Sequence, residues 1–177
     1  KLKLTTRDLP NYNELMQGRL KILNENNLKL CDIENVIKTL SPLEGAIDFL
    51  SWLKSEFQVI ILSDTFYQFS QPLMEKLDYP TLFCNELITD EQGRITDYRL
   101  RQVDGKTKAV AALKGLNFQV IAAGDSYNDT GMLYEADAGI LFCPPSNVIK
   151  DFPQFPVTKS YNEFKSALLN ARSFLTT

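Results

Sequence analysis

The sequence contains no histidine and only three cysteines, and these shortages exclude several kinds of site. Without histidine there is no Ser–His or Cys–His catalytic arrangement and no histidine-ligated zinc. The cysteines, Cys31, Cys84 and Cys143, are scattered and odd in number. This usage is typical of a reduced cytosolic protein rather than of a disulfide scaffold.

Long hydrophobic runs and an excess of positive charge are also absent. No stretch approaches the roughly 18 consecutive apolar residues of a membrane span. The opening segment, residues 1–6, is too short and too polar for a signal peptide. The formal net charge of −3 argues against broad electrostatic binding of nucleic acid. We therefore expect a cytoplasmic protein with no nucleic-acid partner and no membrane partner.

The chain has 177 residues and carries an alternating pattern of strands and helices over most of its length. Continuous apolar, β-branched runs are typical of strands that are buried on both faces. Such strands are predicted at 57–62, 81–87, 118–123 and 138–142. Helices are predicted between them, at 67–77 and 106–115. This alternation predicts an α/β fold with a doubly wound parallel sheet.

The first 40 residues favour helices instead. Asp32 is predicted to cap a short helix within this segment. Ser41-Pro42-Leu43-Glu44 has the features of another helix start: a hydroxyl cap, a proline in the first turn and a glutamate at the third position. We therefore predict a small helical segment over 1–40 and an α/β core over 41–177.

Three polar features lie where ligands bind in such sheets, outside the carboxyl ends of the strands. They are Ser63-Asp64-Thr65, the segment 124–129 (Gly-Asp-Ser-Tyr-Asn-Asp) and Lys106. In the second of these, Asp125 and Asp129 stand four residues apart, and their carboxylates suit Mg²⁺. A serine hydroxyl can donate to a phosphate oxygen, and a lysine can neutralise charge on a transferring phosphoryl group.

Each of these residues also has a purely structural interpretation. Asp129 could cap the helix that follows it, and Ser63 or Asp64 could form a turn. Lys106 could be a solvated surface charge. The functional interpretation depends on all three features meeting at one edge of one sheet.

Three motifs make the chain resemble the haloacid dehalogenase superfamily of phosphatases. VIILSDT (59–65), a lysine at 106 and IAAGDSYND (121–129) look like the second, third and fourth motifs of that family. TTRDLPNYNELMQGRLKIL, LSPLEGAIDFLSWL and ILSDTFYQFSQPLM extend the resemblance to its phosphoserine phosphatase and homoserine phosphotransferase subfamily. The resemblance covers nearly the whole chain. It implies a small-molecule substrate, phosphoserine, with water or homoserine as the phosphoryl acceptor.

The resemblance also implies roles for individual residues. Ser63 and Lys106 are expected to bind the phosphoryl group, with Asp64 and Thr65 contributing to the substrate site. Asp125 is expected to ligate Mg²⁺, Asp129 to support the metal site, and Asn128 to face the phosphate. The helical segment 1–40 resembles the cap of the family. Within it Arg19 matches the arginine that holds the substrate carboxylate, a role that suits a guanidinium fork.

One departure from the family concerns the nucleophile. The family begins with a hydrophobic strand that ends in Asp-x-Asp/Glu-Gly, and the first aspartate becomes phosphorylated. No strand precedes residue 11, and no two aspartates of the chain are two positions apart. We therefore expect the central first strand, between those ending at Leu62 and Ala123, to be missing. The two open strand edges would pair directly or with another chain, for example in a homodimer.

Two functions follow from this departure. The first is Mg²⁺-dependent phosphomonoester hydrolysis through an aspartyl-phosphate, with the 177 residues inactive by themselves. The alternative is a non-catalytic module that binds phosphorylated ligands or a partner. A nucleotide-binding Rossmann protein fits less well, because no Gly-x-Gly-x-x-Gly follows a strand.

Overall fold

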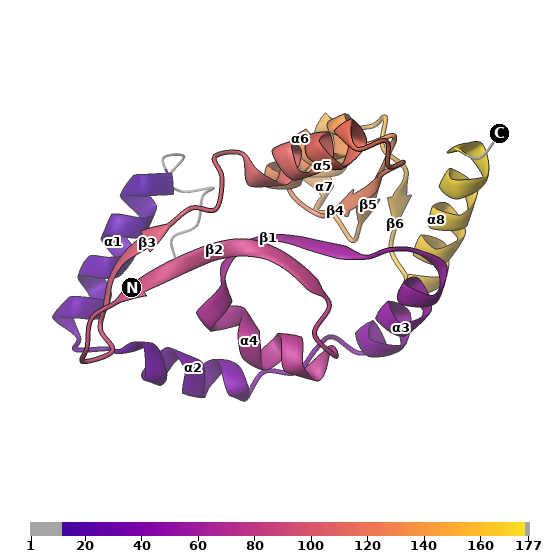
Figure 1. The fold of residues 1–177 in the computed structure, drawn as a ribbon. Coiled ribbons are helices and arrows are strands. Elements are labelled where there is room, and N and C mark those ends of the chain that lie inside the picture. Colours follow the sequence, from indigo (N-terminus) through magenta and orange to yellow (C-terminus); the bar gives the residue numbers. More distant parts are fainter. Residues whose placement is uncertain (1–11, 176–177) are drawn as a thin grey trace. The chain divides into compact units, whose positions relative to one another are not determined.

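The computed structural model describes residues 12–175 (Figure 1). The elements are α1 (Tyr12–Glu25), α2 (Leu30–Lys38), α3 (Ala46–Glu56), β1 (Ile60–Phe66), α4 (Tyr67–Lys76), β2 (Thr81–Thr89), β3 (Ile95–Arg99), α5 (Gly105–Gly115), β4 (Ile121–Gly124), the 3-10 helix η1 (Tyr127–Asp129), α6 (Thr130–Glu135), β5 (Ala138–Phe142), α7 (Ser146–Asp151), β6 (Val157–Thr158) and α8 (Tyr161–Leu175). Residues up to Arg101 form a first compact unit, and residues from Gln102 form a second.

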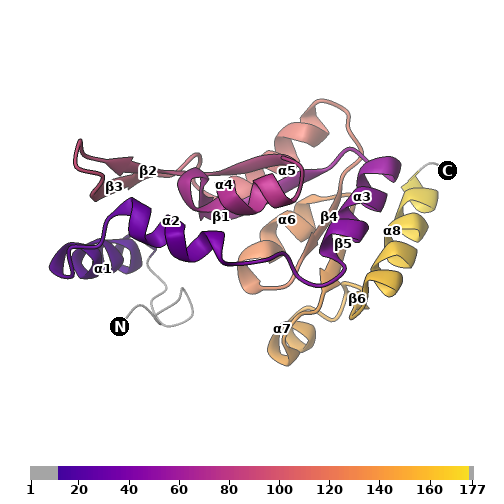
Figure 2. The ribbon, with the colours of Figure 1, turned by 90° about the horizontal axis from the view of Figure 1, so that it is seen from below.

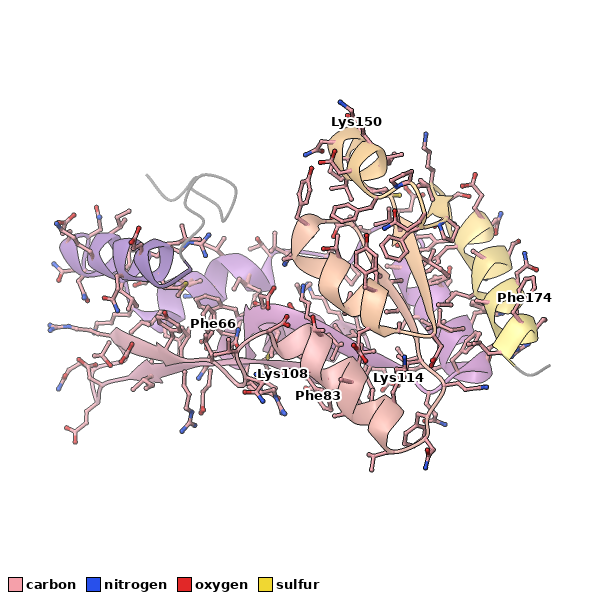
Figure 3. The ribbon with its side chains drawn as sticks, turned by 90° about the horizontal axis from the view of Figure 1, so that it is seen from above. Phe66, Phe83, Lys108, Lys114, Lys150 and Phe174 are labelled. Carbon is pink, nitrogen blue, oxygen red and sulfur yellow. The ribbon has the colours of Figure 1, made fainter. Side chains whose placement is uncertain are left out.

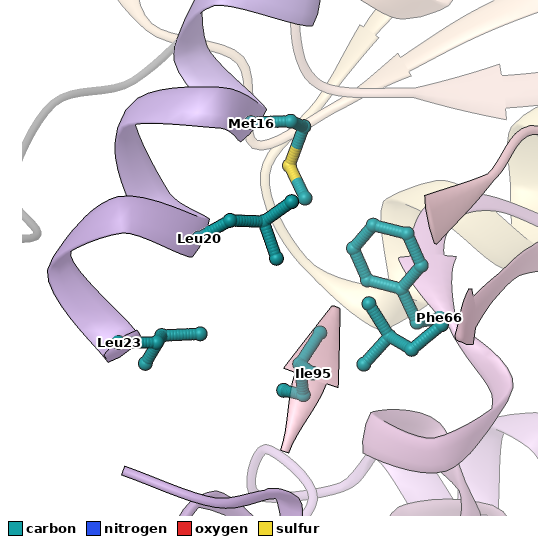
Figure 4. Close-up of a cluster of buried hydrophobic side chains, with 6 residues drawn as sticks. Met16, Leu20, Leu23, Phe66 and Ile95 are labelled. Carbon is teal, nitrogen blue, oxygen red and sulfur yellow. The ribbon is translucent and has the colours of Figure 1, made fainter. Parts of the chain in front are cut away.

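The first unit is built on a three-stranded sheet in the order β1-β2-β3. β1 and β2 are parallel, and β2 and β3 form an antiparallel hairpin. Helix α4 packs against β1 and β2, α2 packs against α4, and α1 packs against β3. The core beneath α1 contains Met16, Leu20, Leu23, Phe66, Leu87 and Ile95 (Figure 4). α1 therefore buries its apolar face on the hairpin, as amphipathic spacing requires.

The second unit is a parallel sheet in the order β4-β5-β6. Helix α6, with α5 against it, covers one face of this sheet, and α8 covers the other (Figures 1 and 2). Ile140 and Leu141 on β5 are fully enclosed between these layers. Helices on both faces of a parallel sheet confirm the predicted doubly wound α/β fold.

Three local predictions were wrong. The helix predicted to start at Ser41 begins at Ala46, because Gly45 takes a left-handed conformation (φ 77°) that no first helical turn contains. Asp32 lies inside the first turn of α2, where its carboxylate accepts from the Lys29 N–H at 2.8 Å, and it does not precede the helix. The strand predicted at 57–62 begins at Ile60 and extends to Phe66, so it includes Ser63, Asp64 and Thr65.

In each sheet the strand that comes first in the chain lies at an edge. Among the described residues, β1 pairs only with β2 and β4 pairs only with β5. The expected direct pairing of these two strand edges is therefore not seen within residues 12–175. A boundary between cap and core near residue 41 stays a prediction. None of the helices within residues 12–175 is long and apolar enough to cross a membrane.

Candidate active site

The segment 124–129, here called the motif loop, connects β4 to α6 and folds around the carboxylate of Asp129. This side chain is buried, with 5% of the residue exposed. Its Oδ2 accepts from the backbone N–H groups of Asp125 (3.0 Å) and Ser126 (3.1 Å) and from the Ser126 hydroxyl (2.9 Å). The carboxylate therefore fixes the turn that presents Asp125.

Lys106 meets the other oxygen of the same carboxylate. Its Nζ lies 2.8 Å from Asp129 Oδ1, and the two side chains are only 12% and 7% exposed. The packing of α5 against α6 makes this approach possible, because a Cβ on Gly131 of α6 would meet Thr107 Oγ1 of α5 at 2.5 Å. At the far end of α5, Lys114 (Figure 3) forms an ion pair of 3.2 Å with Asp137. Helix α5 is thus held at both ends.

The ionisation of Asp129 follows from these contacts. Burial by itself raises the pKa of the carboxyl group. The hydrogen bond and charge of Lys106, with the bonds from Ser126 and the Asp125 N–H, outweigh burial and hold the pKa below its ordinary value. The site therefore holds a buried carboxylate–ammonium pair.

This pair contradicts two of the structural interpretations. Lys106 is not a solvated surface charge, because its side chain is mostly enclosed. Asp129 immediately precedes α6 but makes no side-chain capping bond to it.

Gly124 is required by the same close packing. A Cβ at this position would lie 2.6 Å from Asp129 Cγ, well inside the contact distance of two carbon atoms. The backbone of β4 therefore runs directly against the buried aspartate. This contact explains why a glycine ends the strand.

The two aspartates of the motif loop offer different donors to a cation. Asp125 is exposed, and the hydrogen bond found for it uses its backbone N–H. Asp129 has its oxygens engaged by Lys106 and by the loop. Asp125 therefore fits a direct ligand of Mg²⁺, which needs only one or two protein carboxylates together with waters and phosphate oxygens. Within the described part of the chain no cluster of three or more acidic, cysteine or histidine side chains could hold a metal by itself.

Asn128 lies in η1 between Tyr127 and Asp129, and it is exposed. Its side-chain amide lies beside the Ser126 hydroxyl, whose one hydrogen is donated to Asp129. The structure thus brings together four of the predicted residues: Lys106, Asp125, Asn128 and Asp129.

The first unit holds the other predicted motif, within the last four residues of β1. β1 and β4 belong to different sheets among the described residues, so the expectation that all three polar features meet at one edge of one sheet was wrong. Ser63 Oγ accepts from the Thr65 N–H at 3.2 Å, a local turn that agrees with the structural interpretation of this serine. Asp64 is exposed. The backbone register of β1 against β2 is irregular between Leu62 and Phe66. The three residues therefore leave the regular ladder before the strand ends.

Asn85 was missed by the sequence analysis. It is buried on β2, and its Nδ2 donates to the carbonyl oxygen of Asp64 at 3.2 Å. Its Oδ1 accepts from the N–H of Arg101 at 3.0 Å. The guanidinium of Arg101 stacks over Phe83, 4.6 Å from the ring centroid. The available signal was an asparagine inside a predicted strand, because a polar side chain that is buried there needs partners.

Arg19 lies on α1 in the first unit. The residue is partly buried, and its Nη1 is 3.9 Å from the sulfur of Met16. Met16 belongs to the core beneath α1, so the stem of the arginine rests at the edge of that core. Its proposed role toward a substrate carboxylate stays a prediction.

The chain is similar to several known proteins. A family model described as haloacid dehalogenase-like hydrolase matches residues 5–137. A phosphoserine phosphatase of Pseudomonas syringae pv. tomato is 59% identical over 170 residues, which cover 96% of this chain and 72% of that protein. The phosphoserine phosphatase ThrH of Pseudomonas aeruginosa is 58% identical over 172 residues, 97% of this chain and 84% of the relative.

Solved structures give the same result. The apo form of a phosphoserine phosphatase has a TM-score of 0.70 at 25% identity, covering 87% of this chain and 79% of that one. A substrate-bound phosphoserine phosphatase has a TM-score of 0.67 at 26% identity, covering 86% and 74%. Because the family model matches residues 5–137, which are most of the chain, this chain belongs to the haloacid dehalogenase-like hydrolases.

Proposed function

We propose that this hydrolase is a Mg²⁺-dependent phosphatase that acts on phosphoserine. The observation that carries the proposal is the buried Lys106–Asp129 pair beside the exposed carboxylate of Asp125. An ammonium group held in a poorly hydrated place, next to a metal-binding carboxylate, suits a phosphoryl group. Relatives that are 58% and 59% identical are phosphoserine phosphatases, which supports the choice of substrate.

Each residue of the motif loop then has a distinct task. Lys106 binds the phosphoryl oxygens, and Asp129 holds the lysine ammonium group in place. Asp125 holds Mg²⁺, which supplies positive charge at the phosphoryl group when it is bound. The amide nitrogen of Asn128 donates to a phosphoryl oxygen.

In the first unit, Ser63 donates its hydroxyl to the phosphoryl group, while Asp64 and Thr65 contribute to the substrate site. The Ser63 oxygen accepts from the Thr65 N–H, so the hydroxyl is already oriented by its own turn. Asn85 fixes the backbone of this turn through the Asp64 carbonyl. Arg19 binds the carboxylate of phosphoserine, because a guanidinium fork matches both carboxylate oxygens.

The phosphoryl acceptor follows from the family resemblance. In the reaction that the family resemblance implies, a nucleophilic aspartate takes the phosphoryl group from the serine oxygen and passes it to water or to the hydroxyl of homoserine. The 177 residues contain no Asp-x-Asp pair. The nucleophile is therefore not among the residues assigned here.

The test is phosphate release from O-phospho-L-serine by the protein expressed from its complete reading frame. We expect turnover that requires Mg²⁺ and is lost in Lys106→Met and Asp125→Asn. O-phosphoethanolamine, which lacks only the carboxylate, is the matched control and should be the poorer substrate. Binding of phosphoserine without any turnover would instead support the non-catalytic module, which the missing Asp-x-Asp pair favours.

A cytoplasmic location also belongs to the proposal. Cys31, Cys84 and Cys143 are all free thiols in the structure, which supports a reducing compartment. A homodimer formed through an open strand edge stays part of the proposal as well. Size measurement by light scattering distinguishes it from a monomer.

A further inference from the structure

The motif loop has a second attachment, on the side of η1 that faces α7. Tyr127 is the first residue of η1, and its hydroxyl donates to Asp151 Oδ2 at 2.6 Å. Its ring meets the ring of Phe152 edge to face, with centroids 5.7 Å apart. Tyr127 is 40% exposed, so its ring does not serve mainly to fill a core. A short bond from a phenol to a carboxylate is charge-assisted and stronger than an ordinary hydrogen bond.

The segment that receives Tyr127 is itself braced. Phe152 also contacts the ring of Tyr134 on α6, and Tyr134 contacts Phe155 at 5.0 Å. Gln154 donates to the Tyr134 hydroxyl. Phe155 in turn lies against β5, where a Cβ on Gly139 would come within 2.8 Å of it. Asp151 therefore belongs to a fixed segment rather than to a freely moving surface.

η1 needs such support because of its length. A 3-10 helix of three residues makes few hydrogen bonds of its own, and their geometry is poorer than in an α-helix. Asp129 holds the C-terminal end of η1, through Lys106 and the loop amides. Tyr127 holds the N-terminal end of η1, through its hydrogen bond to Asp151. Asn128 lies between these two anchors, so its direction depends on both.

We propose that Tyr127 and Asp151 are positioning residues, which hold η1 so that Asn128 is directed at the phosphoryl group. This inference rests on the proposed function for the role of Asn128. The Tyr127–Asp151 hydrogen bond is called the tie below. Its geometric role, the ordering of the motif loop, does not depend on any activity.

The experiment compares Tyr127→Phe and Asp151→Asn with Tyr134→Phe as the matched control. The control removes a hydroxyl from the same aromatic cluster but not the tie to η1. Two quantities are measured in the chain of 177 residues: the affinity for inorganic phosphate in the presence of Mg²⁺, and the hydrogen exchange of the amides of 125–129.

We expect each tie variant to weaken phosphate binding by roughly tenfold and to speed exchange of the Asp129 amide by a similar factor, as the loss of a charge-assisted bond implies. Tyr134→Phe should change both quantities less than about twofold. The double variant Tyr127→Phe/Asp151→Asn should be no worse than either single variant, since one bond is lost in every case. A merely structural role would lower the urea midpoint of unfolding without this selective change in the motif loop.

Several results would overturn the inference. One is unchanged exchange in 125–129 in both tie variants, and another is an equal change in Tyr134→Phe. Should the wild-type chain fail to bind phosphate, the proposed function fails, and the exchange data alone decide whether the tie orders the loop. If Tyr127→Phe unfolds globally, Asp151→Asn decides, because it keeps the size of the side chain.

Discussion

Removal of the Lys106 ammonium group should destabilise the protein. The contacts of Asp129 allow the loss in the free energy of unfolding to be estimated. Lys106→Met keeps the apolar stem of the side chain, so the packing of α5 on α6 is preserved. Asp129 then remains 5% exposed without its cation. Breaking a buried pair in this way costs about 3–5 kcal/mol. Because two backbone N–H groups and a hydroxyl still donate to the carboxylate, we expect the lower end, about 3 kcal/mol.

Urea unfolding measures this loss. With a slope of about 1–3 kcal/mol/M, the midpoint should fall by roughly 1–3 M while the slope stays the same. Asp129→Asn removes the other charge, and the double variant Lys106→Met/Asp129→Asn should lose at least about 1 kcal/mol less than the two single losses added together. Strictly additive losses, or a loss in Lys106→Met below about 0.5 kcal/mol, would refute the reasoning that the pair is buried and coupled.

Three further predictions concern single residues. Gly124→Ala should lower the free energy of unfolding by about 1–3 kcal/mol, because the new Cβ would lie 2.6 Å from the Cγ of Asp129. Gly115→Ala is the control, because a Cβ there meets no atom within 4 Å. Equal urea midpoints in the two variants would contradict this prediction. The Asp137 pKa is lowered, chiefly by the Val120 N–H that donates to it at 2.8 Å. Its stabilisation is therefore complete above the unfolded pKa of about 3.9 and is lost as the pH falls through the lowered pKa. Urea midpoints measured between about pH 2 and 6 should depend less on pH in Asp137→Asn, and identical pH profiles would exclude this role. In the protein expressed from its complete reading frame, Arg19→Ala should weaken the turnover of phosphoserine by roughly tenfold or more but leave that of O-phosphoethanolamine nearly unchanged, and an equal loss on both would make Arg19 structural.

The sequence predicted the parts of the fold and site that depend on local pattern. The apolar run over 118–123 predicted β4, although the strand begins at Ile121 and ends at Gly124. The run over 138–142 predicted β5 with its bounds. The spacing of Asp125, Asn128 and Asp129 placed all three on one short turn after a strand, where the structure has them.

Other features depend on tertiary packing and could not be predicted in this way. The burial of Lys106 results from the close approach of α5 and α6 at Gly131, which no local pattern encodes. The bridge made by Asn85 joins residues 21 and 16 positions away, so only the paired strands bring its partners together. The start of α3 was misplaced because Ser41 and Pro42 favour a helix locally, whereas Gly45 takes a backbone conformation outside it.

The most direct test of the account is a calorimetric titration of O-phospho-L-serine into the chain of 177 residues, with and without Mg²⁺. The account predicts saturable binding that requires Mg²⁺, weakens about 10–100-fold in Lys106→Met and is lost in Asp125→Asn. It also predicts no phosphate release in the same samples, because the 177 residues contain no Asp-x-Asp pair. Release that disappears in Asp64→Asn would assign the role of nucleophile to Asp64. Phosphoserine binding that depends on neither Mg²⁺ nor Lys106, or no binding at all, would contradict the assignment of the site.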